Sequence, residues 1–199
     1  MLASMAWRAR RIGGGVAVAA LIALEARYSF AQAHAGGRIG ARSTALGGDV
    51  DLDPAIRPAV AGFVNIDVTT LFAVGAELQA SSSGSEEYRL RYLSAPLLVH
   101  ARHRVGANAA ARISLGLAPA WLATAEYIHG TDGGGEVSDD VRPTLRVWDV
   151  GLVAATAVQV QVGRVGYLIE LRYVRGTMSI DEDLFVTNRE LGLWIGAQL

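Results

Sequence analysis

The chain has 199 residues, no cysteine, an apolar content of 51% and a formal charge of −1. This length suits one domain, and the lack of cysteine excludes a disulfide framework and a thiolate metal site. The mean hydropathy of +0.29 is high for a water-soluble protein whose sequence has no long helical span. The order of apolar and polar residues along the chain therefore carries most of the information.

The N-terminal segment has the three parts of a secretion signal. A positive region contains Arg8, Arg10 and Arg11. An apolar stretch follows over 12–24, and small residues at 31–35 offer a cleavage site. We predict a signal peptide over 1–33, cleaved after Ala33 or Ala35, because the apolar run is shorter than the roughly 20 residues of a transmembrane helix. Cleavage removes four Arg and one Glu and leaves a formal charge near −4, which argues against nucleic-acid binding.

The remaining chain alternates apolar with small or polar residues at a period of two, which indicates β-strands. In the clearest segment, one face carries Phe72, Val74, Ala76, Leu78 and Ala80. The other face carries Gly75, Glu77 and Gln79. We expect eight strands, over 37–46, 58–67, 71–81, 88–102, 109–123, 145–160, 164–177 and 188–199.

These strands can present apolar side chains to lipid only if they close into a cylinder, since closure satisfies every backbone group in the hydrocarbon. We predict an all-β fold: an eight-stranded antiparallel up-and-down transmembrane β-barrel over 36–199, in the cell outer membrane. The short connections are expected on the periplasmic side, at 67–70, 103–108 and 161–163. The long ones are expected outside, at 47–57, 81–87, 124–144 and 177–187.

A soluble periplasmic carrier of the lipocalin type is the main alternative. It shares the strand alternation but turns its apolar side chains into a closed cavity. The two folds invert the faces, so Phe72, Val74 and Leu78 would lie outside in one and inside in the other.

Four sequences carry a resemblance to a known family. They are Leu90-Arg-Tyr-Leu-Ser-Ala-Pro-Leu-Leu-Val-His100, Leu115-Gly-Leu-Ala-Pro-Ala-Trp121, Trp148-Asp-Val-Gly-Leu-Val153 and Ile169-Glu-Leu-Arg-Tyr-Val-Arg-Gly176. In this order they resemble the small outer-membrane β-barrel family that includes the PorT-like proteins, over most of 36–199. The resemblance implies an eight-stranded membrane barrel without a defined biochemical activity for most members, and a secretion-associated barrel as an alternative. Leu199 departs from the usual terminal aromatic residue.

Charged residues at inward positions are the first candidate site. If the alternation is interpreted correctly, the lumen contains Glu77, Arg112, Asp149, Glu170, Arg172 and Glu190. An eight-stranded barrel is just wide enough for side chains to fill it. We therefore expect a lumen plugged by a network of these charges, with a small-solute or ion pore as the alternative.

We predict no enzymatic activity, no catalytic residue and no cofactor. His129 and Thr131 suggest a His-assisted hydroxyl nucleophile, but such a pair needs an orienting third group that the spacing does not supply. We interpret His129 as a loop histidine. His100 and His103 are interpreted as part of a polar belt near a periplasmic turn.

The predicted outer loops are acidic. Candidates for a divalent-cation site are Asp49, Asp51, Asp53, Asp181 and Asp183. Neither acidic sequence completes a known calcium loop, so a solvated rim is expected and no metal site is predicted. The acidic loops are expected to contact a surface or envelope protein partner, and outer-membrane lipids are expected to surround the strands.

Overall fold

The computed structural model describes residues 32–49, 53–130, 136–180 and 185–199, which form one antiparallel sheet. Its strands are β1 (Ala33–Gly48), β2 (Ala55–Asp67), β3 (Phe72–Gly84), β4 (Tyr88–Ser94), β5 (Leu97–Arg104), β6 (Ala109–Gly130), β7 (Glu136–Asp140), β8 (Trp148–Val162), β9 (Val165–Gly176) and β10 (Val186–Gln198). A 3₁₀ helix covers Arg142–Thr144. Within the described part of the chain, no helix is long and apolar enough to cross a membrane.

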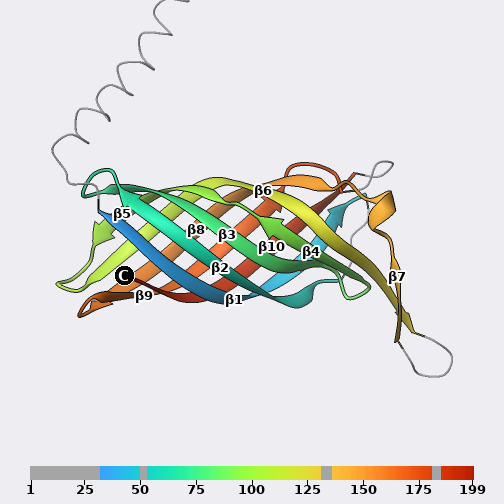
Figure 1. Ribbon diagram of the computed structural model, residues 1–199, viewed down its shortest axis with the longest axis horizontal. Helices are drawn as coiled ribbons and strands as arrows, with labels where there is room; N and C mark the ends of the chain where they lie inside the picture. Colours follow the sequence, from blue (N-terminus) through green and yellow to red (C-terminus); the bar gives the residue numbers. More distant parts are fainter. Residues whose placement is uncertain (1–31, 50–52, 131–135, 181–184) are drawn as a thin grey trace, which may run out of the picture.

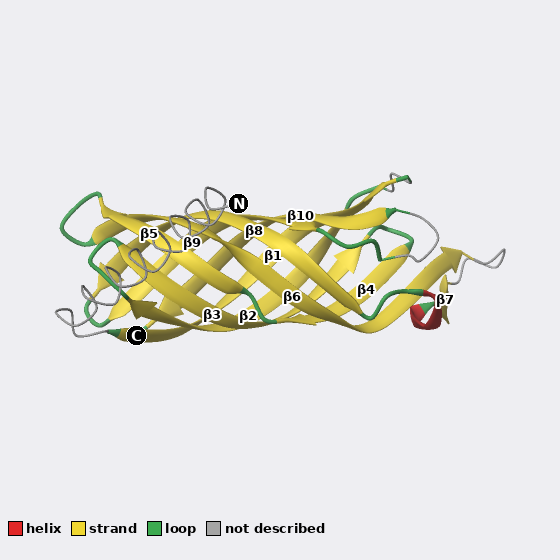
Figure 2. Cartoon of the chain, turned by 90° about the horizontal axis from the view of Figure 1, so that it is seen from above, coloured by secondary structure: helices red, strands yellow, loops and turns green. Residues whose placement is uncertain are grey.

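The strands form a ring of eight positions. Neighbours in sequence pair around the ring, and β1 pairs with β2 on one side and with β10 on the other. β4 and β5 together occupy one position, because each of them pairs with both β3 and β6. Figures 1 and 2 show the resulting cylinder, with steeply inclined strands. The predicted all-β, eight-stranded antiparallel arrangement is confirmed.

The expected strand 88–102 is interrupted at Ala95 and Pro96. A proline has no N–H to donate to a neighbouring strand, and β4 ends just before it. The ladders nevertheless continue through carbonyl groups: Glu77 N–H donates to Pro96 O at 2.9 Å, and Ala95 N–H donates to Pro119 O at 2.9 Å. Both prolines are therefore accommodated as acceptors.

Two expected outer loops are corrected. The predicted loop 124–144 contains a hairpin instead, because β6 continues to Gly130 and pairs with β7, which projects beyond the ring (Figure 1). The predicted loop 81–87 shrinks to 85–87, because β3 continues to Gly84. Gly84 has φ +108°, and a Cβ there would lie 2.2 Å from the Tyr88 carbonyl oxygen, so only glycine fits this turn.

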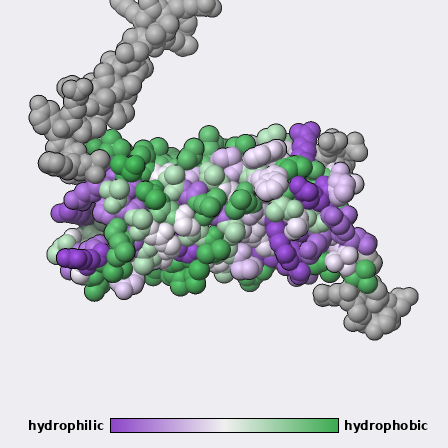
Figure 3. All heavy atoms as spheres, in the orientation of Figure 1, coloured by the Kyte–Doolittle hydropathy of each residue, from purple (hydrophilic) through white to green (hydrophobic). Residues whose placement is uncertain are grey.

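The outer face of the ring is apolar and the inner face is polar. Phe72, Val74 and Leu78 are 50%, 43% and 61% exposed, so they lie outside. Figure 3 shows apolar side chains along the middle of the cylinder and hydrophilic ones gathered toward its ends. This arrangement contradicts the inverted faces of a lipocalin-type carrier.

Apolar packing inside the ring is confined to small clusters. One cluster near the end that carries the β6–β7 hairpin contains Leu46, Leu90, Leu122, Ile180 and Val186. Elsewhere the inside of the ring, here called the lumen, is lined mainly by polar and charged side chains. The end with the hairpin is called the outer end below.

Most of the predicted signal peptide lies outside the described residues. β1 begins at Ala33, which pairs with Ile66 of β2. Cleavage after Ala33 would leave this ladder almost complete, whereas cleavage after Ala35 would remove the first three residues of β1.

Candidate functional site

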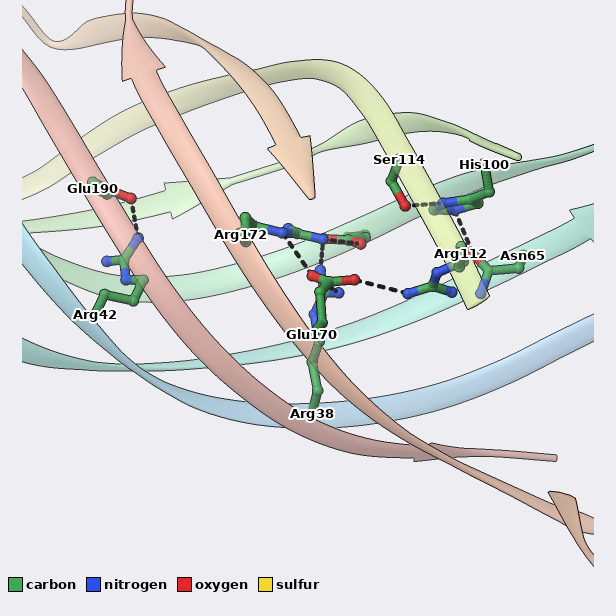
Figure 4. A network of polar contacts seen from close by, with 10 residues as sticks. Arg38, Arg42, Asn65, His100, Arg112, Ser114, Glu170, Arg172 and Glu190 are labelled. Atoms are coloured by element: carbon green, nitrogen blue, oxygen red, sulfur yellow. Dashed lines mark hydrogen bonds and ion pairs between the residues drawn. The ribbon is translucent and has the colours of Figure 1, made fainter. Parts of the chain in front are cut away.

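A buried ion-pair network crosses the lumen. The central network consists of Arg38 (β1), Glu77 (β3), Arg112 (β6), Glu170 and Arg172 (both β9). Their side chains are at most 7% exposed. Figure 4 shows how Arg38, Arg112, Glu170 and Arg172 converge from different sides of the ring. The network therefore connects strands that do not pair with one another.

Glu170 is the most heavily paired member of the central network. Its Oε1 accepts from Arg38 Nη1 and from Arg172 Nε, each at 2.8 Å, and its Oε2 accepts from Arg112 Nη2 at 2.8 Å. Three guanidinium groups thus share one carboxylate. Its side chain is 0% exposed, so these contacts replace its hydration completely.

Glu77 forms the second acceptor of the network. Arg172 Nη1 donates to Glu77 Oε2 at 2.8 Å and Nη2 donates to Oε1 at 3.1 Å, which is the parallel two-bond geometry that guanidinium and carboxylate favour. Arg38 also donates to Glu77. Three arginines and two glutamates give the central network a formal charge of +1.

Trp194 of β10 lies against the arginines of the network. Its ring centroid is 5.0 Å from Arg38 Cζ and 5.7 Å from Arg172 Cζ, within the range of cation–π attraction. Gly40 makes room for this ring, because a Cβ at Gly40 would lie 2.6 Å from Trp194 Cδ2. Trp194, an aromatic residue on the otherwise polar inner face of β10, therefore packs against the central network.

Closer to the outer end, a smaller outer cluster consists of Arg42, Ser83 and Glu190. Arg42 and Ser83 both donate to the Glu190 carboxylate. Arg42 Nη2 also donates to the carbonyl oxygen of Ser82 at 2.7 Å. The predicted lumen residue Glu190 is thus paired, but in a cluster separate from the central network.

Asp149 does not join either group of ion pairs. Its carboxylate accepts from the Val150 backbone N–H at 2.7 Å and from Asn188 Nδ2 at 3.4 Å, and the Asn188 amide also donates to the Tyr92 hydroxyl at 3.2 Å. All six charges predicted for the lumen are buried, and the structure brings four of them together.

The expectation that His100 belongs to a polar belt near a periplasmic turn is wrong. It is only 2% exposed and points into the lumen, because it occupies an inward position two residues beyond Leu98. His100 Nδ1 lies 2.8 Å from Ser114 Oγ, and Nε2 lies 3.0 Å from Asn65 Oδ1 (Figure 4). The carbonyl oxygen of Asn65 can only accept, so Nε2 donates and Nδ1 accepts from the Ser114 hydroxyl.

The Ser114, His100 and Asn65 side chains are residue types that can form a hydrolytic triad. Here Ser114 is 1% exposed. Neither Ser114 nor His100 lines the two lumen cavities described next. The Ser114 hydroxyl is therefore not exposed to either of those cavities, and the three groups form hydrogen bonds to one another. Gly75 is required for this, because a Cβ there would lie 2.5 Å from both Asn65 Oδ1 and His100 Nε2.

Two cavities lie within the lumen formed by the described residues. A vestibule of about 880 Å³ opens at the end opposite the hairpin, and its lining includes Asp67, Arg102, His103, Arg104 and Arg164. A small cavity of about 40 Å³ is lined in part by Arg42, Arg172 and Glu190. The central network contributes Arg172 to the small cavity and no residue to the vestibule.

Sequence reasoning missed Arg38, Arg42 and the partners of His100. The signal for the arginines was present: Arg38, Gly40, Arg42 and Thr44 alternate with outward residues in the predicted strand 37–46. The His100 partners lie on β2 and β6, and only the pairing register brings them together.

The acidic residues do not form a metal site in the part of the chain that the structure describes. Asp49 accepts a hydrogen bond from the Phe185 N–H at 2.9 Å, and Asp53 is exposed. Asp51, Asp181 and Asp183 lie outside the described residues, as does Thr131. Glu126, expected in a loop, lies within β6.

A ring of eight antiparallel strands with an apolar outer face and a polar inner face is the architecture of small outer-membrane β-barrels. No protein-family model matches the chain, and no curated protein does. The resemblance to the PorT-like proteins therefore stays a prediction.

Solved structures resemble this fold. The crystal structure of neisserial surface protein A matches with a TM-score of 0.59 and 10% identity, over 84% of this chain and 98% of that chain. Ail of Yersinia pestis, crystallised with the heparin analogue sucrose octasulfate, gives 0.46 and 13%, over 84% and 99%. The N-terminal β-barrel domain of Pseudomonas aeruginosa OprF gives 0.43 and 12%, over 84% and 100%. The likeness to neisserial surface protein A is one of fold.

Proposed function

We propose that this protein is an outer-membrane β-barrel with a structural or surface-binding role and a plugged lumen. The observation that carries the proposal is the contrast between the two faces of the wall. The outer face exposes apolar side chains such as Leu78, Ile113 and Ile169 at about 60%. The inner face buries the paired charges of the central network. Such a wall is stable where lipid lies outside it.

The plug is supported by the pairing within the central network. Arg38, Glu77, Glu170 and Arg172 have side chains that are at most 2% exposed, and the network joins opposite sides of the ring. A roomy aqueous channel belongs to barrels with roughly 16 or more strands. We therefore place the function on the surface of the barrel and treat a pore as the alternative.

A surface-binding role is supported by exposed carboxylates at the outer end. Exposed carboxylates on its connections and hairpin belong to Asp49, Asp53, Glu86, Glu87, Asp139 and Asp140. Several negatively charged carboxylates at the membrane surface favour a partner with a basic contact surface.

The membrane location can be tested by labelling introduced thiols, because the sequence has no cysteine of its own. Leu78→Cys places a thiol on the apolar outer face, and Ser138→Cys places one on the exposed β6–β7 hairpin. In intact cells, a membrane-impermeant maleimide should label the Ser138→Cys chain and spare the Leu78→Cys chain until the membrane is dissolved. Recovery as a soluble periplasmic protein, or labelling of Leu78→Cys in intact cells, would contradict the proposal.

The plug has a separate test. The unmodified chain, refolded into planar lipid bilayers, should give no steady conductance steps. Regular open steps from this chain would favour the pore instead.

A further inference from the structure

The outward face of β9 and β10 is a ladder of directly paired side chains. Its apolar rungs are Tyr167 with Ala197, Ile169 with Ile195, Leu171 with Leu193, and Tyr173 with Leu191. The next outward pair toward the outer end is Arg175 with Arg189, and both side chains are exposed. The apolar ladder therefore ends in two arginines that face each other across the strands.

This pairing is unfavourable for the isolated protein. Directly opposite side chains in an antiparallel pair have Cβ atoms about 4.5–5.5 Å apart, and like charges in that position destabilise the sheet. Neither Arg175 nor Arg189 has an ion-pair partner among the residues that the structure describes. Two exposed cations placed side by side attract an anion.

The outward arginines of β4, which also lie at the outer end, are paired differently. Arg89 Nη1 and Arg91 Nη2 on β4 lie 3.7 Å and 3.9 Å from the Glu126 carboxylate oxygens. The chain thus supplies its own counter-charge at β4, whereas none of the described residues forms an ion pair with Arg175 or Arg189. Arg91 is for this reason a matched control.

We propose that Arg175 and Arg189 together bind the phosphate group of a membrane lipid, an inference that rests on the proposed membrane location. A guanidinium group offers donors in a planar fork that fits phosphate oxygens, and two such groups can hold one phosphate from both sides. The pair lies one rung beyond Tyr173, and tyrosine rings favour the level where hydrocarbon meets the head groups. Phosphate of the head groups lies at the level just beyond.

The test uses the full chain in neutral detergent micelles, titrated with phosphatidic acid, with the first bound lipid counted by native mass spectrometry. Each Arg is worth about 1 kcal/mol near an anionic lipid surface, which corresponds to about five-fold in affinity. Arg175→Gln and Arg189→Gln should each raise the apparent Kd by about this factor, and the double variant should raise it further. Arg91→Gln should leave the apparent Kd within about two-fold, because Glu126 already neutralises part of that charge.

The outcomes separate the two proposals. Unchanged affinity in the double variant, or an equal loss in Arg91→Gln, would overturn the lipid site. Equal competition by inorganic phosphate would make it a site for free anions and overturn the lipid assignment. Failure of the unmodified chain to insert into phosphatidylcholine vesicles would overturn the membrane location and this inference together, whereas insertion with no effect of the double variant would overturn this inference alone.

Discussion

Arg172 and Arg175 lie three residues apart on β9, on opposite faces of the wall. Arg172 faces the lumen, is 2% exposed and donates to both Glu77 and Glu170. Arg175 faces outward beside Arg189. The inner face is stabilised by ion pairs between its own side chains. The outer face is proposed to be stabilised by the lipid around the barrel. The same type of residue therefore has a structural role inside and is available for binding outside.

The largest expected effect comes from Glu170→Gln. This change leaves Arg38, Arg112 and Arg172 with Glu77 as the one remaining glutamate charge of the central network, at buried positions. Removing one partner of a buried pair costs about 3–5 kcal/mol. Urea unfolding in lipid should show a loss of that size. Glu126→Gln, which removes a half-exposed acceptor from the outer face, should cost about 1 kcal/mol or less. Equal losses in both variants would contradict the contrast between the faces.

The next effect tests the outer face. Leu78→Arg places a charge on the apolar wall, where 61% of the leucine is exposed. In a membrane barrel this costs about 2–4 kcal/mol near the middle of the bilayer. Ser138→Arg on the hairpin should be nearly neutral. If Leu78→Arg unfolds at the same urea concentration as the unmodified chain in lipid vesicles, lipid does not surround this wall.

A smaller effect compares two glycines. At Gly75 a Cβ would meet His100 and Asn65 at 2.5 Å, whereas at the outward-facing Gly37 the nearest atom would be Ala61 O at 3.8 Å. Overpacking a filled interior costs about 1–3 kcal/mol, so Gly75→Ala should destabilise by that amount and Gly37→Ala should not. A neutral Gly75→Ala would show that the His100 site has more room than these contacts indicate.

The sequence predicts the wall better than the lumen contacts. Alternation along a strand decides which side chains face inward, and Glu77, Glu170 and Arg172 could be assigned from it alone. Which charges meet depends on the register between strands, so Glu77 could not be matched with Arg38 and Arg172 in advance. Arg38 was overlooked although the same alternation marks it.

The hairpin and the strand break had weaker signals. Glu136–Asp140 is short and polar, so it has no apolar alternation and is typical of a loop, although it pairs with β6. Pro96 shows that a ladder bond is missing, but not that two strands share one position in the ring.

Tryptophan quenching by lipid tests the two-faced wall most directly. Trp148 is 63% exposed on the outer face, whereas Trp194 is 0% exposed in the lumen. Two variants, each keeping only one of these tryptophans and carrying phenylalanine at Trp7, Trp121 and the other position, would be refolded into phosphatidylcholine with brominated acyl chains. Trp148 should be strongly quenched, and Trp194 should be quenched much more weakly. Equal quenching of both, or quenching of neither, would contradict a lipid-facing outer wall around a polar lumen.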